Sequence, residues 1–330
     1  MRVAVIGVGS MGFNHLRVYS ELQDVQLAGI ADVSAERLQT LGDRFSVPTY
    51  SDYRELIEKE KPEAVSITVP TAEHEKVASF ALRAGVHVLV EKPIAATVEE
   101  GQRLIDLAKE MQRHLMVGHI IRFNPAMQAL KARLDAGELG KIFQIFCRRA
   151  GPFPARIRDV GVVIDLAPHD VDIMRFLTGL EPLRVFAETE QRIHTEHEDM
   201  LFGLLRFPHG ITAALEINWL TPTKLRETLV LGEKGLFRVD DLVQDLYFFE
   251  NSLATGDLWS PLKTIRGVSE GKMIRFDLKR QEPLKAELQA FLDSVRTGVP
   301  VPISGEDGLK ALRLALALVE SGVKHQVIEV

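Results

Sequence analysis

Apolar runs and amphipathic segments alternate through the first third of the chain. Val3 to Ile6 is a continuous apolar run, which is typical of a strand buried on both faces. Gly12 to Leu22 has the apolar spacing of a helix, and the same order of strand and helix recurs as far as Val117. Repeated strand–helix units with short connections predict a parallel sheet covered by helices. The other strands predicted here are Val25 to Ala31, Thr49 to Tyr50, Ala64 to Val69, Val86 to Val90 and Leu115 to Val117. The other helices predicted here are Ala35 to Phe45, Tyr53 to Lys59, Glu73 to Ala84 and Thr97 to Met111.

The pattern changes after about Phe123. A helix from Pro125 to Ala136 and a strand from Ile142 to Arg149 come first. The next helix is expected from about Pro168 to Leu177, with the proline in its first turn. Several strand patterns follow, joined by tight turns such as Pro208-His209-Gly210, and this order is typical of a mostly antiparallel sheet. These strands are Arg184 to Gln191, Met200 to Phe207, Ile211 to Asn218, Glu227 to Leu231, Leu236 to Val239 and Leu246 to Phe249. The last two predicted helices are Leu284 to Arg296 and Asp307 to Ser321.

Size and composition narrow the class of protein. A chain of 330 residues exceeds the size at which one core usually stops growing, so we predict two domains, residues 1–122 and 123–330. A formal net charge of −6 disfavours nucleic-acid binding, for which a basic surplus is typical. The lone Cys147 leaves no internal disulfide, which suits a reducing compartment. Neither a signal peptide nor an apolar run of about 18 residues is found, so we expect a cytoplasmic protein with no membrane partner.

A glycine-rich loop follows the first predicted strand and opens the first predicted helix. In Gly7-Val8-Gly9-Ser10-Met11-Gly12, the first glycine permits a tight turn and Gly9 lets the backbone approach a pyrophosphate. Gly12 lets the helix pack close to the sheet. The helix N-terminus offers free N–H groups and partial positive charge, which suit a phosphate. The loop therefore predicts a dinucleotide site; the alternative is a glycine turn without a ligand.

Asp32 stands 20 residues after Gly12, at the end of the second predicted strand. A carboxylate at this place accepts hydrogen bonds from the adenosine ribose and repels a 2′-phosphate, which favours NAD over NADP. Arg37 is close enough in sequence to weaken that preference. The alternative is an ordinary turn residue at the end of a strand.

Glu91-Lys92-Pro93 directly follows the predicted strand Val86 to Val90. Ligands of open parallel sheets bind beyond the carboxyl ends of the strands, so Lys92 is well placed to reach a substrate. Pro93 restricts the local backbone and thereby the orientation of the lysine. The alternative is a lysine–proline turn at the surface.

A second cluster of candidate residues runs from Asp165 to Asp172. Near neutral pKa, His169 is suited to take a hydroxyl proton while hydride leaves the same carbon. A nearby carboxylate such as Asp165 would orient the ring and support its charged form. The alternatives are a capped structural histidine and a zinc site of Asp165, His169 and His197. No cysteine pair or His-Glu-x-x-His spacing supports zinc, so we expect no metal.

Together these motifs resemble the glucose–fructose oxidoreductase, inositol dehydrogenase and MocA (Gfo/Idh/MocA) family. The resemblance runs over the whole chain and includes Pro70-Thr71 with His74, Arg122-Phe123-Asn124-Pro125 and Glu282-Pro283-Leu284. It implies an α/β fold in which an N-terminal Rossmann domain precedes an α+β domain with a large, mostly antiparallel, open-faced sheet. It also implies that the exposed face of this sheet joins a homodimer or homotetramer.

The resemblance also implies the site. Lys92, Asp165 and His169 would line the active site; in the family's sugar dehydrogenases the histidine commonly serves as base. The lysine helps to hold the reacting hydroxyl and the nicotinamide. The NAD site predicted on this basis comprises Gly7, Gly9, Ser10, Met11, Gly12, Asp32, Arg37, Thr68, Pro70, His74, Glu91 and Lys92.

An arginine-rich segment, Arg148 to Gly161, leads into the catalytic segment and holds four arginines. Guanidinium groups suit phosphates because their donors form a planar fork. The segment is similar to the corresponding region of UDP-N-acetylglucosamine 3-dehydrogenases, which suggests oxidation at C3 of a UDP-linked N-acetylhexosamine. The alternatives for the segment are a solvated basic loop and an oligomer contact. The alternatives for the function are an inositol or free-sugar dehydrogenase and a non-catalytic NAD-binding regulator. The predicted substrate-binding residues are Arg122, Asn124, Arg149, Arg156, Arg158 and His169.

Overall fold

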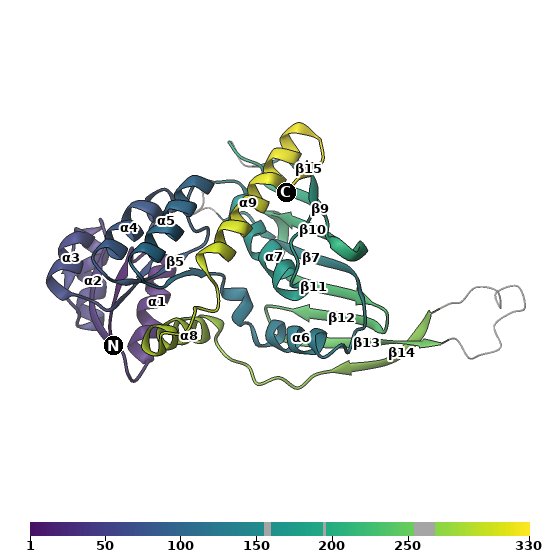
Figure 1. Cartoon of the computed structure of the whole chain (residues 1–330), viewed down its shortest axis with the longest axis horizontal. Coiled ribbons are helices and arrows are strands. Elements are labelled where there is room, and N and C mark those ends of the chain that lie inside the picture. Colours follow the sequence, from purple (N-terminus) through teal and green to yellow (C-terminus); the bar gives the residue numbers. More distant parts are fainter. Residues whose placement is uncertain (155–159, 194–195, 254–267) are drawn as a thin grey trace, which may run out of the picture. The chain divides into compact units, whose positions relative to one another are not determined.

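The computed structural model describes the whole chain except residues 155–159, 194–195 and 254–267 (Figure 1). The chain divides into two compact units. The first, called unit 1 here, comprises Met1–Ile120 with Glu282–Arg313, and unit 2 comprises Ile121–Gln281 with Leu314–Val330. The predicted domain boundary between residues 122 and 123 stays a prediction, since the compact units describe packing and not independent folding.

Unit 1 is built on a parallel six-stranded sheet with the order β3-β2-β1-β4-β5-β6, which confirms the predicted parallel sheet. The strands are β1 (Arg2–Ile6), β2 (Gln26–Ala31), β3 (Thr49–Tyr50), β4 (Ala64–Ile67), β5 (His87–Glu91) and β6 (Leu115–Gly118). Both neighbours of β1 pair with it in parallel, and the chain order reverses between β1 and β4. Such a reversal opens a crevice at the carboxyl ends of the strands, where ligands of open α/β sheets bind.

Helices cover both faces of this sheet, and local signals in the sequence set their starts (Figure 1). The side chain of Ser34 accepts a hydrogen bond from Arg37 N at the start of α2. Thr97 and Glu100 form the predicted capping box of α5, with each side chain bonded to the other's backbone N–H. The helices of unit 1 are α1 (Ser10–Glu21), α2 (Ala35–Phe45), α3 (Tyr53–Glu60), α4 (His74–Arg83), α5 (Val98–Glu110) and α8 (Pro283–Thr297). Helix α9 (Gly305–Lys324) contributes residues to both units.

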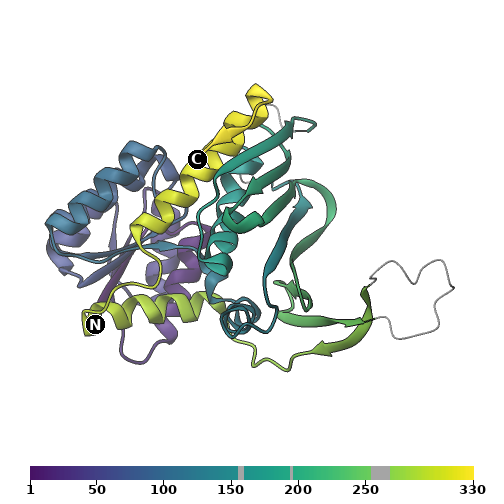
Figure 2. The same ribbon diagram turned by 45° about the vertical axis from the view of Figure 1, so that its right-hand side comes forward.

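Among the described residues, unit 2 holds a nine-stranded sheet with the order β14-β13-β12-β11-β7-β10-β9-β8-β15 (Figure 2). Strands β7 and β10 pair in parallel and the other neighbours are antiparallel, as predicted for most of the sheet. The strands are β7 (Ile142–Pro152), β8 (Arg184–Glu190), β9 (Met200–Arg206), β10 (Thr212–Asn218), β11 (Leu220–Gly232), β12 (Gly235–Asp240), β13 (Asp245–Leu253), β14 (Val268–Arg275) and β15 (Ile328–Glu329). Strand β11 begins seven residues before the predicted one, at Leu220, and β14 and β15 were not predicted. Helices α6 (Pro125–Asp135) and α7 (Val162–Thr178) pack on one face of this sheet.

Helix α7 corrects one sequence prediction. It begins at Val162 and not near Pro168, which lies inside the helix. An interior proline removes one backbone hydrogen bond and costs roughly 3 kcal/mol. The buried side chains of Val162, Val163 and Leu166 offset this cost, because each apolar side chain stabilises by about 1.5–3 kcal/mol when fully buried. Asp165 therefore lies in the first turn of the same helix as His169.

No helix in the described part of the chain is long and apolar enough to cross a membrane.

Candidate functional site

The glycine loop adopts the geometry that its sequence predicts. Gly7 has φ +87°, and a Cβ atom there would lie 2.8 Å from the backbone nitrogen of Val69. A Cβ atom at Gly12 would lie 1.9 Å from the carbonyl oxygen of Gly7, so only glycine allows α1 to start so close to β1. The predicted tight turn at Gly7 and close packing at Gly12 are confirmed. Thr68, at the end of β4, donates its hydroxyl hydrogen to the Gly7 carbonyl oxygen and so braces the loop.

The first turn of α1 has the features of an anion-binding helix start. A Cβ atom at Gly9 would meet no described atom within 4 Å, and no side chain caps the helix at this N-cap residue. Uncapped N–H groups at a helix start, together with the helix dipole, favour a phosphate group. Ser10 is exposed and Met11 half-buried in this turn.

Asp32 is oriented by the backbone at the end of β2. Its Oδ2 accepts a hydrogen bond from Val8 N at 2.7 Å, and its Oδ1 accepts one from Ser34 N at 2.8 Å. The side chain is 6% exposed, and a guanidinium nitrogen of Arg37 lies 3.9 Å from Oδ1. The carboxylate is thus held beside the glycine loop, in the position from which a ribose is recognised.

His74 links the segments that follow β4 and β5. Its Nδ1 lies 2.8 Å from the carbonyl oxygen of Pro93, and its Nε2 lies 3.0 Å from the carbonyl oxygen of Val69. Burial lowers the pKa of His74, against the smaller opposing effect of the two carbonyl groups. Pro70, between these segments in sequence, is exposed. His74 therefore holds Pro93, and with it the segment that carries Lys92.

Glu91 is the last residue of β5, and Lys92 follows it through a half-buried turn with a cis Lys92–Pro93 peptide bond. The Oε1 atom of Glu91 lies 3.0 Å from Nε2 of His15, which belongs to α1. A Cβ atom at Gly118 would lie 3.0 Å from the same Oε1 atom, so the carboxylate packs directly on the backbone of β6. Both contacts fix the side chain that precedes Lys92.

Asp165 and His169 are half-buried and lie four residues apart on α7, so they share one face of the helix. Asp172, three residues further on, is buried. The structure thus places Asp165 and His169, which the sequence singled out, on one helix. It does so because α7 begins at Val162, earlier than predicted.

Three of the predicted substrate-binding residues make side-chain contacts inside unit 2. Arg122 donates from Nε and Nη2 to the two carboxylate oxygens of Asp172, at 2.8 and 2.6 Å. Arg149 does the same with Asp170, at distances of 2.8 to 3.0 Å. Asn124 caps α6 by accepting a hydrogen bond from Ala126 N. Arg122 and Arg149 are thus buried and doubly bonded to carboxylates. The substrate-binding role predicted for these three residues stays a prediction. Arg156 and Arg158 lie outside the described residues.

Arg226, which the sequence patterns did not single out, is the neighbour of Arg149 across the β11–β7 pair. Its Nη1 donates to the carbonyl oxygens of Ala150 and Leu225, at 2.6 and 2.7 Å. Burial, and then the charge of Arg149, lower the pKa of Arg226 to about 10, while Asp165 is among the carboxylates that raise it. Within the part of the chain that the structure describes, the direct hydrogen-bond partners of this guanidinium are backbone carbonyl oxygens and not carboxylates.

Asp241 also went unnoticed in the sequence. It is buried, with Oδ2 lying 3.5 Å from Nη2 of Arg149, and burial raises its pKa to about 6. Asp241 and Arg226 become neighbours of Arg149 only through strand pairing and the turn after β12. The sequence pattern around each of these two residues does not indicate that it lies near Arg149.

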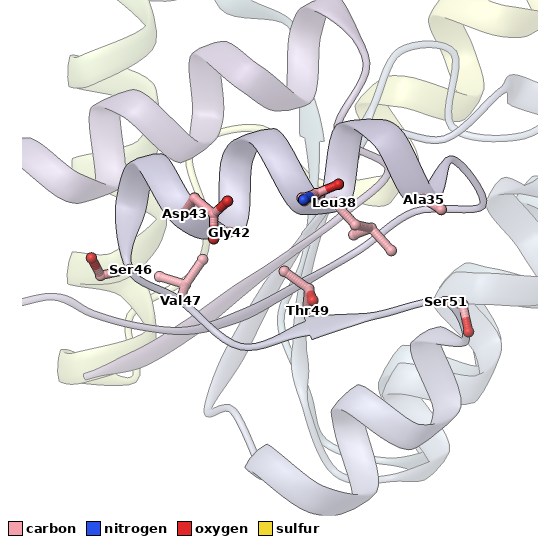
Figure 3. A pocket seen from close by; sticks show the side chains of 9 residues that line it. Ala35, Leu38, Gly42, Asp43, Ser46, Val47, Thr49 and Ser51 are labelled. Carbon is pink, nitrogen blue, oxygen red and sulfur yellow. The ribbon is translucent and has the colours of Figure 1, made fainter.

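A pocket of about 770 Å³ lies along α2 and the segment that leads through β3 (Figure 3). Small and apolar side chains such as Ala35, Leu38 and Val47 line much of it, with Asp43 near one end. None of the predicted site residues is among its lining residues. The candidate residues therefore lie at the strand ends of unit 1 and on α7 of unit 2, each described by itself, and this pocket is assigned no role.

Comparisons with known proteins agree over almost the whole chain. Residues 1–119 match the model of an oxidoreductase family with an NAD-binding Rossmann fold, and residues 127–238 match the GFO/IDH/MocA C-terminal domain. The chain is 32% identical to a UDP-N-acetylglucosamine 3-dehydrogenase of Acidithiobacillus ferrooxidans, over 96% of this chain and 95% of that protein. It is 27% identical to a myo-inositol 2-dehydrogenase of Thermotoga maritima, over 97% and 96%. A solved structure of the Acidithiobacillus enzyme superposes with a TM-score of 0.86 at 31% identity and covers 97% of each chain.

Asp32 yields a prediction on cofactor choice. Replacing Asp32 with alanine removes the acceptor for the ribose hydroxyls and the repulsion of a 2′-phosphate. We expect NADH affinity to fall about tenfold or more, as for the loss of a charge-assisted hydrogen bond, while NADPH affinity stays level or rises. Titration of both cofactors by fluorescence measures this. Asp43→Ala is the control, because Asp43 is an aspartate near the C-terminal end of α2, the end away from Asp32. Equal losses for both cofactors would contradict the assigned role.

Proposed function

The chain belongs to the Gfo/Idh/MocA oxidoreductase family, and from this premise we propose that it oxidises the C3 hydroxyl of UDP-N-acetylglucosamine, or of a related UDP-hexosamine, to the 3-keto sugar. The observation that carries the proposal is the 32% identity to a UDP-N-acetylglucosamine 3-dehydrogenase over nearly the full length of both chains. The same fold, with the glycine loop and Asp32 in place, supports it.

NAD, when bound, would be the oxidant, because its nicotinamide ring accepts a hydride. We propose that His169 takes the hydroxyl proton as general base, and that Asp165, one turn away on α7, orients the ring and supports its charged form. Lys92 is proposed to polarise the reacting oxygen with its ammonium group. Together, loss of the hydride to the cofactor and of the proton to His169 leave the ketone.

Arg226 is proposed to bind the diphosphate, with Arg156 and Arg158 as further candidates on the segment outside the described residues. The half-buried guanidinium of Arg226 is unneutralised by direct carboxylate contact among the described residues, and Asp165 is near enough to influence its pKa. A diphosphate is the part of a nucleotide sugar that most needs such a partner, since neutral sugars lack a charge to pair.

A second candidate function is oxidation of inositol or a free sugar. It is supported by the 27% identity to a myo-inositol 2-dehydrogenase over nearly the whole chain. The two candidate substrates differ in charge. The nucleotide sugar needs a cationic side chain to bind its diphosphate, whereas inositol or a free sugar does not. The match to an oxidoreductase family disfavours the alternative of a non-catalytic NAD-binding regulator.

We also propose that the protein forms a homodimer or homotetramer through the nine-stranded sheet. On the face opposite α7, Phe202 and Leu204 of β9 are each 52% exposed. The strand registers align an apolar row across five strands. The row consists of Phe186, Leu204, Ala214, Phe146 and Leu229. Burial of such a row against a second copy removes apolar surface from water.

A cytoplasmic location, proposed from the single buried Cys147, fits an enzyme that uses the cellular NAD pool.

The proposed reaction predicts NADH formation when the protein is mixed with NAD and UDP-N-acetylglucosamine, and a product two mass units lighter than the substrate. A keto acid is added as hydride acceptor, so that tightly held NADH does not hide turnover. We expect His169→Asn to lower kcat by about 10²–10⁴-fold, since it removes the base and retains much of the shape. NADH affinity should be unchanged in this variant. Turnover of myo-inositol or free sugars, with none of the nucleotide sugar, would reject the proposed substrate.

Substitution of Arg226 separates the two candidate substrates. We expect Arg226→Gln to raise KM for the nucleotide sugar about 10–100-fold, the loss of a charge-assisted hydrogen bond, with KM for NAD unchanged. The matched control is Arg238→Gln, because Arg238 pairs with Glu227 on the neighbouring strand and lies on the exposed surface. An unchanged KM in Arg226→Gln would remove Arg226 from the diphosphate site.

The proposed assembly predicts that Leu204→Glu yields a monomer, because the substitution places a charge within the apolar row. Light scattering coupled to size-exclusion chromatography measures the mass of the wild-type protein and the variant. Val323→Glu serves as control, since Val323 is 72% exposed on α9 and away from the row. A monomeric wild-type protein, or a variant of unchanged mass, would refute assembly through this face.

A further inference from the structure

The start of α7 is held by a residue from another part of unit 2. Gly161, the residue before the helix, has no side chain with which to cap it. The backbone N–H groups of Val162 and Val163 donate instead to Glu198, which is half-buried and lies between β8 and β9. The Val162 nitrogen lies 2.9 Å from the carbonyl oxygen of Glu198, and the Val163 nitrogen lies 3.2 Å from its Oε1 atom. One residue thus satisfies two of the N–H groups that a helix start leaves without an intrahelical partner.

Gly161 leaves the space that this contact needs. A Cβ atom there would lie 2.0 Å from Oε1 of Glu198 and 2.2 Å from its carboxyl carbon, so any larger residue would displace the carboxylate. The backbone of Gly161 is extended, with φ −79° and ψ 171°, a conformation open to every residue. The glycine therefore serves the approach of Glu198 to the helix start and not the freedom of the backbone.

The residue after Glu198 is itself held in place. Asp199 is buried, and its carboxylate accepts a hydrogen bond from the backbone N–H of Arg192 at 3.0 Å. The backbone N–H of Asp199 donates to the carbonyl oxygen of Glu190, and its carbonyl oxygen accepts from Trp219 N, both at 2.9 Å. These contacts fix the backbone next to Glu198, so that its carboxylate meets the helix start at a defined position.

The first turn of α7 needs such support because Pro168 interrupts the helix after it. Proline has no N–H, so Pro168 cannot bond to the carbonyl oxygen of Ile164, four residues earlier. The first turn is therefore joined to the rest of α7 by one backbone hydrogen bond fewer than in an uninterrupted helix. Asp165 lies in this turn, and its backbone N–H donates to the carbonyl oxygen of Gly161 at 3.2 Å. A change at the helix start thus reaches Asp165 directly, whereas His169 lies beyond the proline.

We propose that Glu198 is a positioning residue for the reaction, because it caps the helix turn that carries Asp165. By holding the backbone of Val162 and Val163, it fixes the place from which Asp165 orients His169. The inference rests on the proposed roles of Asp165 and His169 and does not depend on which sugar is oxidised. The effect of Glu198 on catalysis must therefore pass through Asp165, which is not required of a residue that only stabilises the fold.

The test is a double-mutant cycle of Glu198→Ala and Asp165→Ala in the full-length chain, with NAD and the sugar that the wild type oxidises. We expect Glu198→Ala to lower kcat about 10–100-fold, since misplacing a catalytic group by about 1 Å can cost that much. KM for NAD should be unchanged, because the predicted NAD residues lie in unit 1. In the Asp165→Ala background, Glu198→Ala should change kcat by less than about twofold, because the group to be positioned is already lost. Glu198→Gln keeps an oxygen acceptor and should retain most of the wild-type kcat.

Gly161→Ala tests the same contact from the side of the helix. Its Cβ atom displaces the Glu198 carboxylate while the glutamate stays in the chain, so kcat should fall as in Glu198→Ala. The matched control is Glu190→Ala, which removes an exposed glutamate that pairs with Arg192 at the start of the same connection. This control should have the kcat of the wild type.

Hydrogen–deuterium exchange of the peptide that covers the first turn of α7 tests the cap without turnover. We expect faster exchange than in the wild type for Glu198→Ala and Gly161→Ala, and wild-type exchange for Glu190→Ala. Unchanged exchange in the first two variants would overturn the proposal.

The kinetic outcomes separate this inference from the proposed function. An equal fall of kcat with and without Asp165 would overturn the positioning role, because a residue that only stabilises the fold gives that result. A Glu198→Gln variant as slow as Glu198→Ala would overturn it too, since the acceptor is retained. A wild-type protein that oxidises neither the nucleotide sugar nor inositol would instead reject the proposed function, and the positioning role with it.

Discussion

The arrangement of unit 1 depends on the close approach of α1 to the first turn after β1. A single Cβ atom at Gly12 would lie 1.9 Å from the carbonyl oxygen of Gly7, so any other residue would push the helix away from the sheet. With the helix in place, His15 and Tyr19 lie on its buried face one and two turns later. His15 then reaches Glu91, and Tyr19 reaches Ser66. One missing side chain thus sets both the phosphate-binding helix start and the contacts that hold the Lys92 segment.

The buried carboxyl group of Glu287 shows what an unpartnered polar group costs a core, since neither of its oxygens has a hydrogen-bond partner among the described residues. A buried neutral polar group without a hydrogen bond costs roughly 1–3 kcal/mol, a large fraction of the net stability of a protein. An apolar residue of similar size would remove this cost.

Unit 2 uses paired charges for a different purpose. Arg122 with Asp172 and Arg149 with Asp170 bind α7 to its surroundings through bidentate hydrogen bonds. Asp170 and Asp172 lie within three residues of His169 on α7. Their partners are arginines that the sequence analysis had assigned to substrate binding. Arg226 differs because its partners are backbone carbonyls. The distinction between a structural and a ligand-binding arginine therefore lies in the partner and not in the residue type.

The sequence by itself determined the parallel sheet of unit 1, the turn at Gly7, the packing at Gly12 and the capping box of Thr97 and Glu100. Each of these depends on residues close together in the chain, whose spacing and backbone preferences act locally. The tertiary structure alone decided the early start of α7, the pairing of Arg149 with Asp170, the place of Arg226 beside Arg149 and the burial of Glu287 next to Glu91. These depend on strand register and on the burial of residues far apart in the chain, because a side chain's charge and hydrogen-bond partners are set by what packs against it.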